Sequence, residues 1–325
     1  MKITYAEGLA KAIHESLASD PRVVLIGGSI VGLNMAARKF MEPVVREFSD
    51  RIMITPVSEL GLAGAGIGAA MCGQRPLVDL GTGSFIYQAF AQVANEAANV
   101  HYMSGGQTSA PVTFYCLAGI RGTGAAQHSQ RTQAMLGNVP GVQVFVPGGA
   151  DDAYGLMKWA LTQSRDPTVF ISHPKLFTET AEIEPGGTML PVGKARIRRQ
   201  GADVTIIANS ITVPLALAAA TLLQQDHRIS AEVVDLRTVV PLDRDTVLAS
   251  VAKTGRAVIA DECHRSFGVA AEIAATLAEE GLASLKGVRR VAVPDVPIPF
   301  SKALEDELLI TSDKIVAAAL EVRSR

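Results

Sequence analysis

Cysteine, basic runs and long hydrophobic stretches are scarce or missing in this chain of 325 residues, and each shortage excludes a class of protein. The three cysteines, Cys72, Cys116 and Cys263, are far apart and lack the spacing of zinc ligands. They predict free thiols in a reducing compartment, in place of a disulfide framework or a cysteine-bound metal. Lysine and arginine (30 residues) nearly balance aspartate and glutamate (32), and the net charge is −2, which disfavours nucleic-acid binding.

No uninterrupted stretch reaches the roughly 18 apolar residues that a membrane-spanning helix needs. The charged first residues do not form a signal peptide, so we expect a cytoplasmic protein with no membrane segment. Hydrophobic residues still make up 48% of the chain, and the mean hydropathy is +0.24. This composition predicts a folded protein whose surplus apolar surface is covered at a large subunit interface.

Short β-branched runs alternate with helix-like segments, which predicts an α/β fold with parallel sheets and helices on both faces. In the first half the expected strands are 23–26, 76–80, 112–116, 142–146 and 168–171, with helices at 5–18, 58–72, 86–98 and 151–163. In the second half the expected strands are 204–208, 231–234, 257–260 and 288–293, with helices at 212–225, 269–280 and 312–322. A polar, turn-rich stretch separates them, so we expect two parallel-sheet domains, 1–181 and 200–325, joined by a linker over 182–199.

The most informative segment surrounds Glu59, a carboxylate followed by a run made almost wholly of Gly, Ala, Ile and Leu up to Gly68. A helix face of small residues lets a flat ring or another backbone approach closely. A partly desolvated carboxylate at the mouth of such a face is suited to share a proton with a ring nitrogen. The alternative is a plain helix start, in which Ser58 caps the helix and Glu59 favours its positive end.

Further motifs follow in order along the chain. They are Gln-His-Ser-Gln at 127–130, the segments 139–147, 234–243 and 253–256, and Pro-Phe-Ser with Ala-Leu-Glu-Asp within 299–306. With the Thr55–Gly68 segment, this ordered set resembles the β subunit of the thiamine-diphosphate-dependent E1 component of 2-oxo acid dehydrogenases, including the acetoin dehydrogenase branch. The resemblance implies an N-terminal pyrimidine-binding transketolase-like domain and a C-terminal transketolase-like domain.

The resemblance also implies roles for three residues. Glu59 would bond N1′ of the aminopyrimidine, and Phe85 would stack on that ring. His128 would face the reacting carbon and steady the substrate or move a proton. The alternatives from the residues alone are a core Phe85 and a surface-loop His128, while His173 and His264 are interpreted as supporting residues.

The chain lacks a Gly-Asp-Gly segment, which in this superfamily precedes an Asn and holds Mg²⁺ and the diphosphate. The resemblance places that motif on an α subunit. We therefore expect thiamine diphosphate to be shared with an α partner that holds Mg²⁺, and no metal ligand on this chain. The implied assembly is an α2β2 heterotetramer with a β–β contact that passes an acyl unit to the lipoyl group of an E2 component.

Two other functions stay open at this point. One is a split transketolase-like protein that moves a ketol unit, with Arg121 and Arg131 as phosphate-binding groups beside His128. The other is a non-catalytic assembly paralogue, because Ser29 and Gln88 stand where the family carries acids. The turn over 162–166 also departs from the family pattern at a place where some relatives bind an alkali-metal ion.

Overall fold

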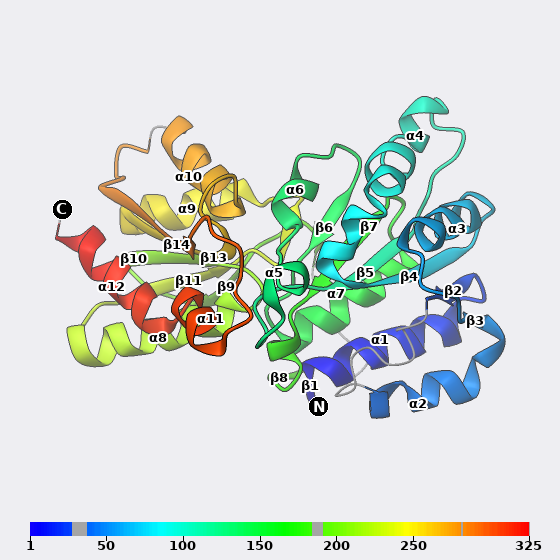
Figure 1. Ribbon diagram of the computed structural model, residues 1–325. Helices are drawn as coiled ribbons and strands as arrows, with labels where there is room; N and C mark the ends of the chain where they lie inside the picture. The colour runs from blue at the N-terminus through cyan, green and yellow to red at the C-terminus, as the bar shows by residue number, and fades with distance from the viewer. Residues whose placement is uncertain (28–37, 184–190, 281, 325) are drawn as a thin grey trace. The chain divides into compact units, whose positions relative to one another are not determined.

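The computed structural model describes residues 1–27, 38–183, 191–280 and 282–324 (Figure 1). The chain forms two compact units. Unit 1 comprises Met1–Ala118 and Met135–Pro191, and unit 2 comprises Gly119–Ala134 and Val192–Arg325. The domain boundaries drawn from the sequence stay a prediction, and residues 184–190 of the expected linker, like Ser29, lie outside the described residues.

Unit 1 contains a parallel sheet in which neighbouring strands follow the order β6-β7-β5-β4-β2-β3, so the predicted parallel sheet is confirmed. Helix α1 packs along α7 and α2 on one side of this sheet, while α3 packs against β4 on the other (Figure 1). The strands are β2 (Val23–Ile26), β3 (Ile52–Met53), β4 (Arg75–Thr82), β5 (Thr113–Leu117), β6 (Gln143–Phe145) and β7 (Thr168–Ser172). The helices are α1 (Tyr5–Ser19), α2 (Arg38–Glu47), α3 (Glu59–Met71), α4 (Val100–Met103), α6 (Gln133–Gly137) and α7 (Ala150–Thr162).

The prediction of one regular helix over 86–98 is wrong in the type and the bounds of the helical segments. The chain forms a 3-10 turn over Gly83–Tyr87 and a π-helical turn over Gln92–Ala97. The 3-10 turn begins at Gly83, where a Cβ atom would come within 2.6 Å of the Cβ of Ala118, so only glycine fits there. Gly81, near the end of β4, has a positive φ (70°), so glycines shape the backbone where β4 leads into the 3-10 turn.

Smaller elements complete unit 1. The antiparallel pair β1 (Lys2–Thr4) and β8 (Thr180–Glu182) joins the two ends of its sequence. Single 3-10 turns lie at Ser49–Arg51 and Pro174–Leu176. Thr4 begins α1 with a capping box, because its hydroxyl accepts the N–H of Glu7 while the Glu7 carboxylate accepts the N–H of Thr4. No helix in the described ranges is long and apolar enough to cross a membrane.

Unit 2 contains a five-stranded sheet in the order β14-β13-β10-β11-β9, parallel except for the edge strand β9. Alternate residues of β10 face opposite layers: Ile206 belongs to the apolar core that includes α8 and α12, and Ile207 to the core that includes α9 and α10. The strands of this sheet are β9 (Arg196–Arg199), β10 (Val204–Ala208), β11 (Ala231–Asp235), β13 (Arg256–His264) and β14 (Gly287–Val293), and the short strand β12 (Thr238–Val240) is not part of it. The helices are α5 (Ala125–His128), α8 (Thr212–His227), α9 (Arg244–Thr254), α10 (Val269–Glu279), α11 (Lys302–Leu308) and α12 (Ser312–Arg323).

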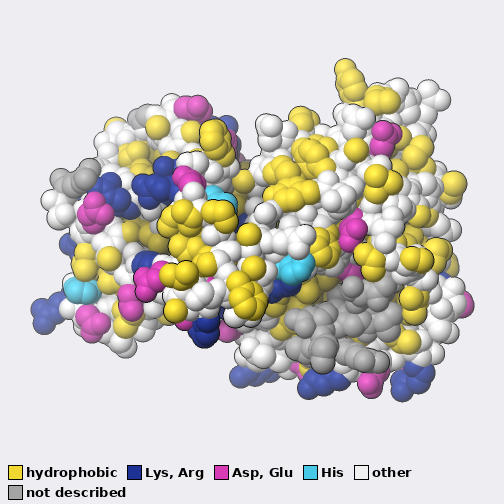
Figure 2. Space-filling view, in the orientation of Figure 1, with side chains coloured by type: hydrophobic (Ala, Val, Ile, Leu, Met, Phe, Trp, Pro, Cys, Tyr) yellow, Lys and Arg dark blue, Asp and Glu magenta, His cyan; other side chains and the backbone are white. Residues whose placement is uncertain are grey.

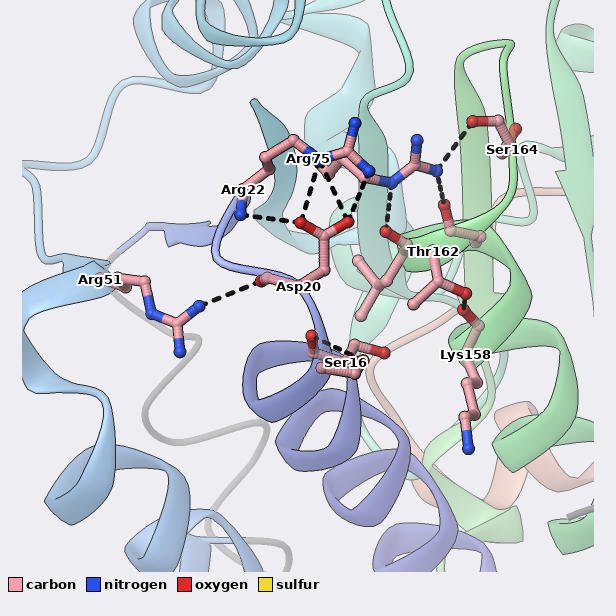
Figure 3. A network of polar contacts seen from close by, with 11 residues as sticks. Ser16, Asp20, Arg22, Arg51, Arg75, Lys158, Thr162 and Ser164 are labelled. Atoms are coloured by element: carbon pink, nitrogen blue, oxygen red, sulfur yellow. Dashed lines mark hydrogen bonds and ion pairs between the residues drawn. The ribbon is translucent and has the colours of Figure 1, made fainter. Parts of the chain in front are cut away.

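A buried guanidinium closes the C-terminal end of α7 (Figure 3). Arg75 on β4 is 8% exposed, and it donates to the carbonyl oxygens of Leu161 (2.5 Å), Ser164 (2.7 Å) and Ala160 (3.3 Å). The last carbonyls of a helix have no partner within the helix, and a cation is favourable there. Arg75 therefore supplies positive charge and hydrogen-bond donors at the turn over 162–166.

Candidate functional site

Glu59 is the first residue of α3, and Ser58 is its N-cap, with the Ser58 hydroxyl accepting the N–H of Gly61 at 3.3 Å. The helix-start interpretation is thus confirmed for Ser58. It is compatible with a proton-sharing role of Glu59, because the cap uses the hydroxyl and not the carboxylate. Glu59 is half-buried, and within the described residues no hydrogen bond or ion pair engages its carboxylate. Its oxygens can therefore accept a hydrogen bond from a bound molecule.

Helix α3 has two different faces. Gly66 lies against β4, where a Cβ would come within 2.4 Å of Cγ2 of Val78, so only glycine permits this close packing. The other face is exposed and made of small residues at helical spacing, Gly61, Gly64, Ala65 and Gly68. A Cβ on Gly64 or on Gly68 would meet no atom within 4 Å. The expected smooth face exists, and nothing in the described part of the chain covers these two glycines.

Phe85 lies in the 3-10 turn that follows β4, and its ring is half-exposed whereas the next residue, Ile86, is fully buried. A register shift between Asp79 and Thr82 ends the regular pairing of β4 with β5. Asp79 accepts the N–H of Gly81 at 2.7 Å, and a Cβ on Gly81 would lie 3.7 Å from Cδ2 of Phe85. The register shift at Asp79–Thr82 therefore determines where the Phe85 ring lies, at the carboxyl end of the sheet.

Asp79 was missed by sequence reasoning, although one acid inside the apolar strand 76–80 was a usable signal. Asp79 lies within β4, at the point where the register with β5 shifts, and 5% of its surface is exposed. Burial raises the pKa of Asp79 to about 6, an effect that the N–H of Gly81 partly offsets. The carboxyl is thus a buried group that can hold a proton near neutral pH.

Asp79→Asn is expected to stabilise the chain at pH 7.5 and to leave its stability at pH 4 nearly unchanged. Because the folded-state pKa is raised, the folded chain holds a proton between about pH 4 and 6 that the unfolded chain releases, so stability falls as the pH rises through this window. A shift of this size corresponds to about 2–3 kcal/mol above pH 6. Denaturant unfolding at both pH values checks the prediction, with the exposed Asp50→Asn as control; a loss of stability at pH 7.5 would contradict it.

His128 ends the single-turn helix α5, and the loop that carries it, Gly119–Ala134, packs as part of unit 2. The structure thus assigns Glu59 and Phe85 to unit 1 and His128 to unit 2. His128 is half-buried and not a freely exposed surface residue. A cavity of about 530 Å³ adjoins its loop within unit 2; the lining residues are Ala126, Gln130, His264, Ser266, Phe267, Asp295, Val296, Pro297 and Ile298.

The residues that follow His128 are polar and deeply buried. Ser129 is 2% exposed, and Thr132 and Gln133 are fully buried. The Ser129 and Thr132 hydroxyls and both polar atoms of the Gln133 amide have no hydrogen-bond partner among the described residues. Buried polar groups are normally satisfied, so this cluster is typical of a segment that acquires partners from a bound molecule or from another chain.

The structure also shows where the two arginines of the ketol-transfer alternative and the two supporting histidines lie. The Arg131 side chain is 2% exposed and forms an ion pair with Glu262 at 3.8 Å, so it is not presented to a substrate phosphate as the ketol-transfer alternative required. Arg121 is half-buried, and burial lowers its pKa. The fully buried His173 accepts the N–H of Lys175 as a structural cap. His264 bonds the carbonyl of Pro294 at 2.8 Å and lines the cavity.

Comparison with known proteins identifies the fold class first. The chain belongs to the transketolase family: the model of the transketolase pyrimidine binding domain matches residues 1–179, and that of the transketolase C-terminal domain matches residues 193–315. A solved structure described as a split gene transketolase, inactive beta4 tetramer, has a TM-score of 0.79 and 25% identity, and the match covers 99% of this chain and 98% of that one. The expected two-domain α/β fold is confirmed.

Relatives that match nearly the whole chain are β subunits of one type of enzyme within this family. The β subunit of the pyruvate dehydrogenase E1 component from Rickettsia felis is 39% identical over 326 residues, 99% of this chain and 98% of the relative. The β subunit of acetoin:2,6-dichlorophenolindophenol oxidoreductase from Cupriavidus necator is 37% identical over 328 residues, 98% of this chain and 96% of the relative. A mitochondrial E1 β-2 subunit from Oryza sativa subsp. japonica is 40% identical, with 98% and 85% covered. The resemblance to E1 β subunits is confirmed, in a family of thiamine-diphosphate-dependent enzymes.

Proposed function

We propose that this chain is the β subunit of an E1-type enzyme that cleaves the carbon–carbon bond next to a carbonyl in a 2-oxo acid or acetoin and passes the acyl unit to lipoamide. One observation carries the proposal. The Glu59 carboxylate stands at the start of α3, unengaged within the described residues, beside an open face of glycine and alanine, in the domain type that binds pyrimidine. This combination suits a flat, nitrogen-containing ring, because a carboxylate that can accept a hydrogen bond stands beside a helix face that such a ring can approach closely.

The residues present fit the pyrimidine end of thiamine diphosphate. When bound, the coenzyme supplies the electron sink for carbon–carbon cleavage. Glu59 would hold a proton shared with the ring nitrogen N1′, which is general acid–base work for a carboxyl group. The half-exposed ring of Phe85 would stack on the aminopyrimidine, a contact worth about 0.5–1.5 kcal/mol beyond area burial. The Gly/Ala face of α3 would let this ring approach without steric conflict.

His128 would serve the substrate end. A half-buried imidazole can bind a substrate carboxylate or carbonyl, or move a proton to a developing alkoxide. The cavity beside its loop is lined by apolar Phe267, Val296 and Ile298 together with a few polar groups, as ligand pockets commonly are.

The Mg²⁺ ion and the diphosphate would be held by an α subunit that carries a Gly-Asp-Gly…Asn motif. Within the described ranges no three His, Cys, Asp or Glu side chains converge as metal ligands, and the sequence has no Gly-Asp-Gly. We place the chain in a cytoplasmic α2β2 assembly with a β–β contact and a lipoyl E2 partner. Large hydrophobic side chains are exposed over α3 and α4 and around α11 (Figure 2), where a partner would cover them. They include Val57, Leu60, Tyr102, Met103, Phe300 and Leu304.

The test is co-expression of this chain with an α subunit that has the Gly-Asp-Gly…Asn motif. The purified complex is expected to reduce an artificial electron acceptor with pyruvate, another 2-oxo acid or acetoin, only when thiamine diphosphate and Mg²⁺ are added. Each chain alone serves as the control and is expected to be inactive. A stable complex with no turnover of any donor would contradict the proposal and favour the assembly role. Transfer of a ketol unit to an aldose in place of acyl transfer would favour the transketolase-like alternative.

A further inference from the structure

We propose that Glu305 is a positioning residue, which holds the turn in front of α5 and thereby fixes His128. Glu305 lies on α11, and its carboxylate oxygens accept the backbone N–H groups of Gly122 (2.8 Å) and Thr123 (2.6 Å). All of these residues belong to unit 2. The inference rests on the proposed role of His128 for its catalytic consequence, but not for the structural effect that it predicts.

Glu305 is buried, so its carboxylate needs the hydrogen bonds that the turn provides. Glu305 is only 2% exposed, although the next two residues of its helix, Asp306 and Glu307, are both exposed. Within the described residues no lysine, arginine or histidine forms an ion pair with Glu305. A buried carboxylate is costly unless it is hydrogen-bonded, and bonds from two successive N–H groups to a carboxylate are strong, charge-assisted ones. The two N–H groups of the turn therefore offset the cost of burying the Glu305 carboxylate, and the carboxylate in turn holds Gly122 and Thr123 in place.

The turn itself is strained. Thr123 and Ala125 both have φ of 54°, and Gly122 has φ of 100°. Left-handed backbone is unfavourable for residues other than glycine, and it persists only where surrounding contacts over-determine it. Gly124 fits between them because a Cβ there would lie 2.7 Å from the hydroxyl of Ser129, the residue that follows His128. Glu305 binds the N–H of one of the two strained residues, so it is the contact best placed to hold this conformation.

His128 depends on contacts of this kind because its own element is short. Helix α5 spans only Ala125–His128, and a single helical turn has little stability of its own. The Arg131–Glu262 ion pair fixes the far side of the loop. The loop is thus held by a buried carboxylate on each side of His128 in the sequence: Glu305 binds the turn before α5, and Glu262 pairs with Arg131 after it.

The experiment uses the co-expressed complex and the variants Glu305→Gln and Glu305→Ala. The matched control is Asp306→Asn on the same helix, whose carboxylate is 47% exposed and paired with Lys302. Hydrogen exchange measured by mass spectrometry is the primary readout. We expect amides within 119–134 to exchange about 10- to 100-fold faster in Glu305→Gln, which loses one charge-assisted bond and keeps one acceptor, and faster still in Glu305→Ala. The strands of the unit 2 sheet and the Asp306→Asn complex are expected to keep the wild-type rates.

Measurements of kcat then test whether loosening the turn by substitution of Glu305 alters the function of His128. Glu305→Gln is expected to lower kcat by about 10- to 100-fold, with little change in the affinity for thiamine diphosphate. In a His128→Ala background the same substitution should cost no further kcat, because a positioning residue acts only through the group it positions. Unchanged exchange over 119–134, accelerated exchange throughout unit 2, or equal additive losses in both backgrounds would each overturn the proposal. If the wild-type complex turns over no donor, the proposed function fails while the exchange measurement still decides the role of Glu305.

Discussion

Glu59→Gln lowers the turnover of the assembled enzyme by about 10²- to 10⁴-fold while the chain still folds and the complex still forms. The amide keeps the size and shape of the side chain, but it cannot exchange a proton with a ring nitrogen. Because Glu59 lies at the N-terminal end of α3, the lost charge also removes a favourable interaction with the helix, worth about 0.3–1 kcal/mol. That stability change is far smaller than the expected barrier change, so the two effects separate cleanly.

The matched control is Asp313→Asn, which removes an exposed acid from the first turn of α12 and has no proposed role in chemistry. Steady-state rates with saturating thiamine diphosphate, together with the unfolding midpoint of each variant, decide the matter. Near wild-type turnover in Glu59→Gln would remove the basis of the proposed site. An equal loss of activity in Asp313→Asn would show that helix electrostatics alone explain the result.

Arg75→Met is expected to lower the free energy of unfolding by roughly 3–5 kcal/mol. Methionine keeps most of the aliphatic stem, but the carbonyl oxygens of Leu161, Ser164 and Ala160 lose their donor in a buried place. Burial lowers the pKa of Arg75, with the nearby Arg22 acting in the same direction, yet an arginine stays charged at any physiological pH. The native chain therefore keeps a cation at this helix end that the variant lacks.

Trp159 gives a local signal for this prediction, since it is the single tryptophan and lies on α7, with its ring 5.8 Å from that of Phe145. Urea unfolding of the purified chain followed by its fluorescence should show an earlier midpoint in Arg75→Met. The control is Arg22→Met, whose side chain is 57% exposed and paired with Asp20; its loss should stay below about 1 kcal/mol. Equal losses in both variants would mean that the bonds to α7 carry no special stability.

Local patterns predicted much of the fold, because each strand and helix carries its own signal. The strand Val23–Ile26 was located to the residue, and β-branched runs elsewhere predicted the parallel strands. Helix α9 was not predicted, although Asp243 as its N-cap and Gly255 at φ 70° were present as start and stop signals. The 3-10 turn after β4 could not be predicted from local pattern, because it contains the close approach of Gly83 to Ala118, a contact between distant parts of the sequence.

Some features of the candidate site could likewise be predicted from the local sequence, and others depend on residues far along the chain. Glu59 and its cap could be predicted because the signal lies within a few residues, and the small-residue face of α3 follows from the sequence directly. The placement of the His128 loop with unit 2 could not be predicted, because it depends on Glu305 and Glu262, which lie far along the chain. The roles of Glu59, Phe85 and His128 stay predictions until the variants are measured.

The path of the backbone has a practical consequence for engineering. The chain passes from unit 1 to unit 2 at residue 119, returns at 135, and leaves again at 192. A chimera made by exchanging only residues 200–325 with a relative would combine the native turn at Gly122 and Thr123 with an α11 from another protein. Successful grafts should therefore transplant residues 119–134 together with the C-terminal half, and excision at the linker alone should yield a fragment whose histidine loop has lost its support.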